Sequence, residues 1–222
     1  MFNTEFQDVG LMPYAEAWRY QEELYNKLLA AKDIDHPFYI IFCEHPHVYT
    51  LGKNGQSNNL LINSDFLSKI NAEYVETNRG GDITYHGPGQ IVGYPIIDLF
   101  KCGFGIKNYI HKLEQAIIDT LTHYKISSER LEGAIGVWID TGTPKARKIC
   151  AIGVHVSHWI TIHGFAFNIS TDLNYFNHIN PCGFTDKGVT SLEKELGFCP
   201  DMQEVKSILK YNLTQQLNLN LS

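Results

Sequence analysis

KICAIGVHVSHWITIHGFAFNI, residues 148–169, contains two runs of aliphatic, aromatic and β-branched residues with only a few residues between them. Such runs are typical of neighbouring β-strands, and a short connection favours antiparallel pairing. A third run of the same kind, GAIGVWID at 133–140, precedes them across the loop TGTPKAR. The three runs together predict an antiparallel meander at the centre of the fold.

Helical periodicity appears on both sides of this region. Residues 13–32 begin with a proline and carry an apolar stripe, and residues 104–124 carry another. Asp201 and Glu204 form a D-x-x-E capping box ahead of a third apolar pattern. Two further strands are expected at 38–43, where Cys43 would be a core residue, and at 90–99. We therefore expect an α+β (α/β) fold, with helices flanking a mostly antiparallel or mixed sheet. No linker or repeat divides the sequence, so residues 1–222 are expected to form a single domain.

The composition excludes several classes of protein. The chain of 222 residues is 44% hydrophobic and 19% charged, with a formal net charge of −6, which argues against nucleic acid as the main partner. No apolar run approaches the roughly 18 residues needed to cross a bilayer. The opening MFNTEFQDVG lacks the features of a secretory signal or a transit peptide. We expect a cytoplasmic protein with no membrane partner.

Cysteines and histidines do not form a recognisable metal or disulfide pattern. Five cysteines are an odd number, and there is no C-x-x-C pair, so a disulfide framework is disfavoured. The nearest approaches to zinc-ligand spacing are HPH at 45–47 and the pair His155 and His158, and both are weak. No metal site is expected.

A glycine-rich stretch, NRGGDITYHGPGQIVG at 78–93, contains more glycine than a plain loop needs. The pair Gly80–Gly81 lets backbone approach a ligand closely, while Arg79 supplies a five-donor fork and His86 a titratable imidazole. The stretch does not match the common phosphate-binding motifs. A hairpin with glycine turns remains the alternative interpretation.

Two cysteines compete as a reactive thiol. Cys182 lies among turn-forming residues in HINPCGFTD, 178–186, where a thiol stays accessible. Cys150 lies two residues from Lys148, on the same face of a strand, so the amine could lower its pKa. Cys150 is also flanked by apolar residues, which favours a buried, unreactive thiol. The residues alone leave open Cys182, Cys150 or no catalytic cysteine.

Three ordered blocks resemble the lipoyl(octanoyl) transferase family. RGGDITYHGPGQIVGY at 79–94 resembles the signature of that family, KICAIGVHV resembles its lysine strand, and HGFAFNISTDLNYFNHINPCG at 163–183 resembles its third block. EHPHVYTLGK at 44–53 is also similar, with His47 where proline is common. The resemblance implies a fold shared with the biotin and lipoate protein ligases. It also implies an enzyme that moves an octanoyl group from acyl carrier protein to the lysine of a lipoyl domain, the first step of protein lipoylation.

The resemblance also assigns roles to individual residues. Cys182 matches the nucleophile that forms the acyl thioester, and Lys148 matches the partner that lowers its pKa. The positions that match the substrate-binding loops are Arg79, Gly80, Gly81, Asp82, Ile83, Thr84, Tyr85, His86, Ala151, Ile152, Gly153, Gly164, Phe165 and Ala166. The implied partners are octanoyl-acyl carrier protein, the lipoyl domains of 2-oxoacid dehydrogenase complexes and the glycine cleavage H protein. A monomer is expected, with no cofactor beyond the phosphopantetheine that carries the acyl group.

Several alternatives stay open at this stage. Lys148 is the expected proton acceptor, and His86 is a competing general base because its intrinsic pKa lies nearer to pH 7. Lys145 and Arg147, in PKARK at 144–148, are either a docking patch for an acidic carrier protein or a solvated turn. The competing functions are an ATP-dependent lipoate or biotin protein ligase, a non-catalytic acyl-binding or scaffold protein, and a cysteine hydrolase.

Overall fold

A mixed sheet forms the body of the molecule in the computed structural model, which describes residues 1–31, 36–180 and 187–221. Its strands run in the order β12-β1-β2-β6-β10-β9-β8-β7, and β11 pairs with β9. Their bounds are β1 Phe2–Leu11, β2 Phe38–Glu44, β6 Gln90–Ile96, β7 Glu129–Leu131, β8 Ala134–Ile139, β9 Arg147–Ser157, β10 Ile160–Asn168, β11 Gly188–Val189 and β12 Leu219–Leu221. The predicted meander is confirmed, because β8, β9 and β10 are consecutive antiparallel neighbours.

Two of the parallel strand pairs lie at the β12 edge of the sheet, opposite the edge formed by β7. β1 runs parallel to both β2 and β12, whereas β2, β6 and β10 pair in antiparallel fashion. The short β11 also runs parallel to β9. The sheet is therefore mixed, as the sequence predicts.

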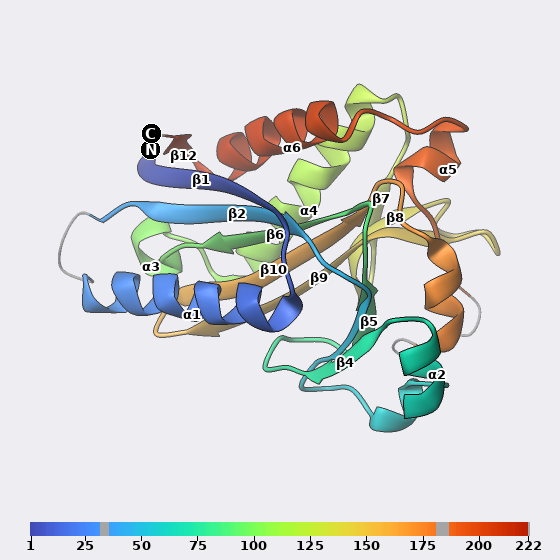
Figure 1. The fold of residues 1–222 in the computed structure, drawn as a ribbon. Helices are drawn as coiled ribbons and strands as arrows, with labels where there is room; N and C mark the ends of the chain where they lie inside the picture. Colours follow the sequence, from blue (N-terminus) through green and yellow to red (C-terminus); the bar gives the residue numbers. More distant parts are fainter. Residues whose placement is uncertain (32–35, 181–186, 222) are drawn as a thin grey trace.

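Helices cover both faces of this sheet (Figure 1). α1 (Tyr14–Ala30) packs on one face against β6 and β10, while α4 (Ile106–His123) and α6 (Met202–Leu217) pack together on the other face. Every residue of β10 is buried for this reason. Burial on both faces also explains why the sequence of β10 is an almost continuous apolar run. The helices predicted at 13–32, at 104–124 and after Asp201 are confirmed.

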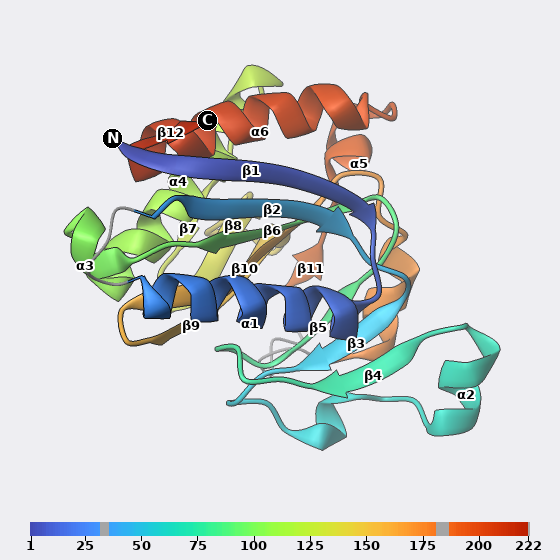
Figure 2. The ribbon, with the colours of Figure 1, turned by 60° about the vertical axis from the view of Figure 1, so that its left-hand side comes forward.

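A second, smaller sheet lies beside the main one, in the order β4-β3-β5 (Figure 2). Its strands are β3 Val48–Leu51, β4 Glu73–Glu76 and β5 Ile83–His86, and α2 (Ser64–Lys69) packs on β4. A separate apolar cluster around Tyr49, Tyr85 and Ile179 supports it. The remaining short elements are η1 Ser57–Asn59, α3 Leu99–Cys102, η2 Leu173–His178 and α5 Leu192–Leu196. No helix in the described parts of the chain combines the length and apolar character needed to traverse a bilayer.

The N-terminus of α6 gives a test of the fold. The Asp201 carboxylate accepts hydrogen bonds from the backbone N–H groups of Gln203 and Glu204, at 2.8 and 2.9 Å. Replacing an N-cap acid by alanine leaves these donors without their partner and costs about 1 kcal/mol. We expect Asp201→Ala to lower the free energy of unfolding in urea by about that amount, and Asp201→Asn to restore most of it. Equal stability of the alanine and asparagine variants would contradict the capping role.

Candidate functional site

A narrow cavity of about 30 Å³ lies where β9 and β10 meet β5, β6 and the start of α1. Its lining combines small, apolar and aromatic residues with a buried cation and two imidazoles. The lining residues are Tyr14, Arg79, Thr84, His86, Val92, Tyr94, Ala151, Gly153, His163, Gly164, Phe165 and Ala166. Such a mixture of apolar walls and a few polar groups is typical of small-molecule sites.

Small residues on paired strands keep this space open. Gly153 of β9 lies directly opposite Gly164 of β10, and Ala151 lies opposite Ala166. A Cβ added to Gly153 would lie 2.8 Å from the carbonyl oxygen of Gly80, so glycine is needed for the close approach of the two backbones. The N–H of Gly80 donates to the carbonyl of Val154 at 3.0 Å, which ties the glycine-rich loop to β9.

Arg79 is a buried cation held by the small sheet. Its Nε and Nη2 donate to Thr50 Oγ1 at 3.2 and 2.9 Å, and Nη2 also donates to the carbonyl oxygen of Thr50 at 2.5 Å. Its Nη1 donates to the carbonyl of Gly80 at 3.0 Å. The side chain belongs to a residue that is only 7% exposed. These bonds fix the guanidinium at the cavity wall.

Alternation along β5 divides its residues between two environments. Thr84 and His86 line the cavity, whereas Ile83 and Tyr85 pack into the apolar cluster of the small sheet. This follows from the two-residue period of a strand. Asp82 faces away to accept from Asn59 Nδ2 at 2.7 Å.

The imidazoles around the cavity are neutral at physiological pH. Burial lowers the pKa of His86 well below its ordinary value, and neighbouring His45 and Arg79 lower it further. Burial also lowers the pKa of His45 to about 4 and, together with Arg79, the pKa of His163 to about 3. The low basicity of His86, and its stacking on Tyr14 at 5.7 Å between centroids, favour a pocket-lining role over that of a general base.

Lys148 lies at the start of β9, and its ammonium is 4.7 Å from the ring centroid of Trp138. An irregularity in the β8–β9 pairing places Trp138 opposite Lys148 and the adjacent Val137 opposite Cys150. Cys150 is fully buried, and burial raises the pKa of its thiol despite the nearby Lys148. These properties are those of a core thiol and disfavour Cys150 as a nucleophile. Cys43 is likewise buried, as expected.

Cys182 lies outside the described residues, but the chain on either side of 181–186 is described. On one side, the N–H of Asn180 donates to the carbonyl of Asn59 at 2.9 Å. On the other side, β11 pairs with the start of β9, with Gly188 opposite Arg147 and Val189 opposite Lys148. The described chain that follows 181–186 therefore lies beside Lys148.

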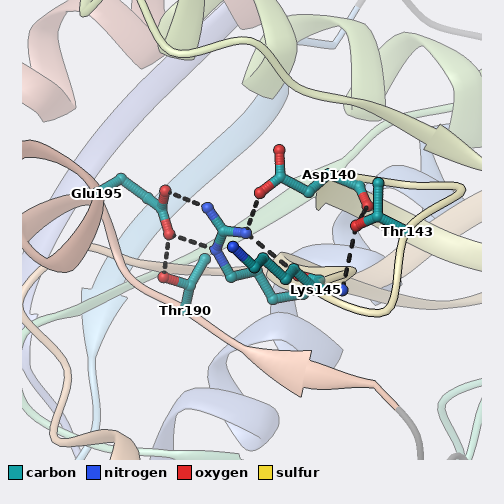
Figure 3. A network of polar contacts seen from close by, with 6 residues as sticks. Asp140, Thr143, Lys145, Thr190 and Glu195 are labelled. Atoms are coloured by element: carbon teal, nitrogen blue, oxygen red, sulfur yellow. Dashed lines mark hydrogen bonds and ion pairs between the residues drawn. The ribbon is translucent and has the colours of Figure 1, made fainter.

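Arg147 anchors this junction through a network of ion pairs (Figure 3). Its Nε and Nη2 donate to the two Glu195 carboxylate oxygens at 2.7 and 2.6 Å, and its Nη1 contacts Asp140 at 2.5 Å. The Thr190 hydroxyl donates to the same Glu195 carboxylate, and the Arg147 guanidinium lowers the pKa of Glu195. Because two carboxylates pair with Arg147, this residue is less available to an acidic carrier protein than the docking-patch interpretation requires. Of the two cations named for that patch, Lys145 is the exposed one.

The cavity brings together eight of the fourteen predicted binding positions, and it also includes residues that were missed. The predicted binding positions that do not line it are Gly80, Gly81, Asp82, Ile83, Tyr85 and Ile152. Of the predicted binding positions, those at the cavity wall are Arg79, Thr84, His86, Ala151, Gly153, Gly164, Phe165 and Ala166. The missed lining residues are Tyr14, Val92, Tyr94 and His163. His163 is the first residue of one of the sequence blocks quoted above, and Val92 and Tyr94 lie in another, so these three residues could have been predicted from the sequence. Tyr14 could not, because it lies in α1, outside every quoted block.

The fold is the α/β fold of the lipoate and biotin protein ligases. A bipartite lipoate protein ligase from Thermoplasma acidophilum is similar with a TM-score of 0.73 at 14% identity, covering 100% of this chain and 86% of that one. A biotin protein ligase from Aquifex aeolicus is similar with a TM-score of 0.53 at 12% identity, covering 98% of this chain and 70% of that one. These likenesses confirm the expected fold.

The chain belongs to the lipoyl protein ligase A/B catalytic domain family, whose model matches residues 13–214. An octanoyltransferase from Bacteroides thetaiotaomicron is 52% identical over 97% of this chain and 96% of its own length. An octanoyltransferase from Cytophaga hutchinsonii is 50% identical over 97% of this chain and 93% of its own. The resemblance to the octanoyltransferase family is thereby confirmed.

The buried histidines predict a loss of stability in acid. The pKa of His45 is about 4 in the folded chain and about 6.5 when unfolded, so the unfolded state binds more protons as the pH falls below 6.5. His45 alone is expected to cost about 2 kcal/mol of unfolding free energy between pH 7.5 and pH 5. Urea unfolding of wild type and His45→Phe at both pH values measures this difference. The exposed His158→Gln should keep the wild-type dependence, and an unchanged dependence in His45→Phe would contradict the assignment.

Proposed function

We propose that this chain transfers an octanoyl group from octanoyl-acyl carrier protein to the lysine of lipoyl domains through a thioester on Cys182, with Lys148 as the proton-transfer partner. The octanoyltransferase relatives at about 50% identity support the reaction. The acceptors are the lipoyl domains of 2-oxoacid dehydrogenase complexes and the glycine cleavage H protein. The enzyme works in the cytoplasm as a monomer without a metal or a further cofactor.

One observation carries the proposal: β9 contributes both Lys148 and a wall of the cavity. Lys148 is three residues from Ala151 on this strand, a separation of about 10 Å along the chain. The same end of β9 pairs with β11, which follows the segment that contains Cys182. This arrangement supports a site in which the reactive end of an acyl chain lies towards the Lys148 end of β9. Burying an alkyl chain contributes up to about 0.8 kcal/mol per CH₂.

The proton balance requires one group that accepts and returns a proton. The neutral amine of Lys148 takes the thiol proton, and the thiolate of Cys182 attacks the thioester carbonyl. The phosphopantetheine thiolate leaves and takes that proton from the Lys148 ammonium. In the second half, the acceptor amine attacks the Cys182 thioester, Lys148 removes its proton, and the proton then returns to the departing Cys182 thiolate. His86, with its lowered pKa, is a weaker candidate for these steps.

A ligase that activates a free acid with ATP is the main alternative. The similar solved structures include a lipoate-protein ligase A with bound ATP, with a TM-score of 0.73 at 13% identity. This level of identity supports a common fold and leaves the reaction open. A ligase would require ATP and would retain activity without Cys182.

Intact mass spectrometry tests the proposal. Incubation with octanoyl-acyl carrier protein should add one octanoyl group, about 126 Da, that hydroxylamine removes and that a lipoyl domain accepts, because the adduct is a reactive thioester. Cys182→Ser should give no hydroxylamine-labile adduct, while the control Cys199→Ser, which replaces a cysteine that the structure shows to be exposed, should react like wild type. An adduct on Cys150, or activity that depends on ATP, would overturn the assignment.

Gly153→Ala should impair the acyl site without unfolding the protein. The new methyl group would press on the carbonyl of Gly80 and on the Arg79 side chain and push the glycine-rich loop away from β9. Overpacking of this kind costs about 1–3 kcal/mol, which corresponds to a factor of about 5 to 150, so we expect the kcat/KM for octanoyl donor to fall about fivefold or more. Gly105→Ser is the control, because a Cβ added at Gly105 would have no atom within 4 Å, and this variant should keep the wild-type kcat/KM. Equal kcat/KM values in the two variants would show that the cavity is not the acyl site.

A further inference from the structure

Four buried residues form a continuous hydrogen-bonded series from the cavity to β11. His86 Nδ1 is 2.8 Å from Gln90 Oε1, Gln90 Nε2 is 2.8 Å from Asn168 Oδ1, and Asn168 Nδ2 is 3.0 Å from the carbonyl oxygen of Thr190. The exposed fractions are 6% for His86, 1% for Gln90, 4% for Asn168 and 0% for Thr190. Buried polar side chains are costly unless fully paired, so a series of this length needs a reason.

Backbone carbonyls fix the direction of the series. The carbonyl of Thr190 can only accept, so Asn168 must present its NH₂ group to it and its oxygen to Gln90. Gln90 must then present its NH₂ group to Asn168, and the same group also donates to the carbonyl of Tyr85 at 3.2 Å. The oxygen of Gln90 is therefore the atom that faces His86.

This direction determines the state of the imidazole. Because Gln90 Oε1 is an acceptor, the hydrogen of neutral His86 resides on Nδ1, and Nε2 carries a lone pair. Thr50 Oγ1, 3.4 Å from that Nε2, already accepts two N–H groups of Arg79, so its own hydrogen is left to donate to His86. Burial and the nearby Arg79 lower the pKa of His86 and keep it neutral.

The other end of the series is Thr190, the residue that follows β11. Its N–H donates to the carbonyl of Lys148 at 2.9 Å, its hydroxyl donates to Glu195 (Figure 3), and its carbonyl accepts from Asn168. All three polar groups of Thr190 are thus engaged. The series connects the wall of the cavity to the backbone of Lys148 through three side chains, of His86, Gln90 and Asn168, and the backbone of Thr190.

We infer that Gln90 and Asn168 are positioning residues for acyl transfer, which hold His86 as the Nδ1–H tautomer and fix Thr190 and the Lys148 backbone relative to the cavity. The catalytic part of this inference rests on the proposed function. Transfer needs the acyl group and the Lys148 amine in a constant geometry, and a displacement of about 1 Å can cost about 100-fold in rate. The two amides supply that geometry without contacting the reacting atoms.

The tautomer is measured on the free protein by ¹⁵N NMR of labelled histidine. Wild type should show His86 with a protonated Nδ1 and an unprotonated Nε2 at pH 7.5. Gln90→Glu places a carboxylate beside Nδ1, so His86 should become doubly protonated. A predominant Nε2–H tautomer in wild type would overturn the inference, and this readout depends on neither activity nor a variant that folds.

The kinetic test uses Gln90→Glu and Asn168→Asp, which conserve side-chain shape and remove one NH₂ donor each. For octanoyl transfer we expect kcat to fall about 10- to 100-fold, with KM for octanoyl-acyl carrier protein within about twofold of wild type. The exposed Gln203→Glu is the matched amide-to-acid control and should keep the wild-type kcat.

The possible failures are distinguishable. Unchanged kcat in folded variants would refute the positioning role. A loss confined to KM would indicate an effect on donor binding and would also refute it. Absence of a Cys182 adduct in wild type would refute the proposed function while leaving the tautomer result standing.

Discussion

The antiparallel pairing of β9 with β10 is the constraint on which the rest of the site depends. It runs from Ser157 opposite Ile160 to Cys150 opposite Phe167 without an irregularity. This register places two glycines opposite each other and two alanines opposite each other, and it thereby opens the cavity. A slip of one residue would send these side chains to the other face of the sheet and would close the space with larger ones. Lys148 lies at the start of the same strand, so the position of β9 determines both the shape of the cavity and the location of the Lys148 backbone.

The buried cation Arg79 and the burial of the imidazoles together set the electrostatics of the cavity wall. Arg79 donates to neutral oxygens of Thr50 and Gly80, and its charge acts on the surrounding groups in a medium of low dielectric constant. Burial is the main cause of the lowered pKa values of His86 and His163, and Arg79 lowers both further and so opposes their protonation. The wall therefore combines one fixed positive charge with neutral imidazoles, which can orient a ligand through hydrogen bonds without changing charge near pH 7.

The sequence predicted the parts of the fold in which local pattern and burial agree. The central meander, α1, α4 and the capped α6 have strong periodicity and were identified correctly. β1 was missed because FNTEFQDVGL mixes polar and apolar residues, and its strand state depends on parallel pairing with β2 and β12, which no local pattern reveals. The small sheet was missed because its strands are only four residues long. At the cavity, eight of the fourteen predicted binding positions form part of the wall, whereas Tyr14 reaches His86 only through the packing of α1 on the sheet.

The comparison of the two candidate cysteines shows what structure adds to a motif. Cys150 is close to Lys148 in sequence, and proximity alone made it a reasonable nucleophile. In the folded chain its burial raises the pKa more than the amine lowers it, because desolvation of a thiolate exceeds the attraction to one partly exposed ammonium. In the proposed function, the reactive thiol beside Lys148 comes from another segment, and acyl transfer then requires the chain on either side of that segment to be held in place. β11 spans only two residues, so its pairing with β9 cannot alone hold this part of the chain in place. The Arg147–Glu195 ion pair and the buried amides of Gln90 and Asn168 provide further support, because Glu195 and Asn168 both form hydrogen bonds with Thr190.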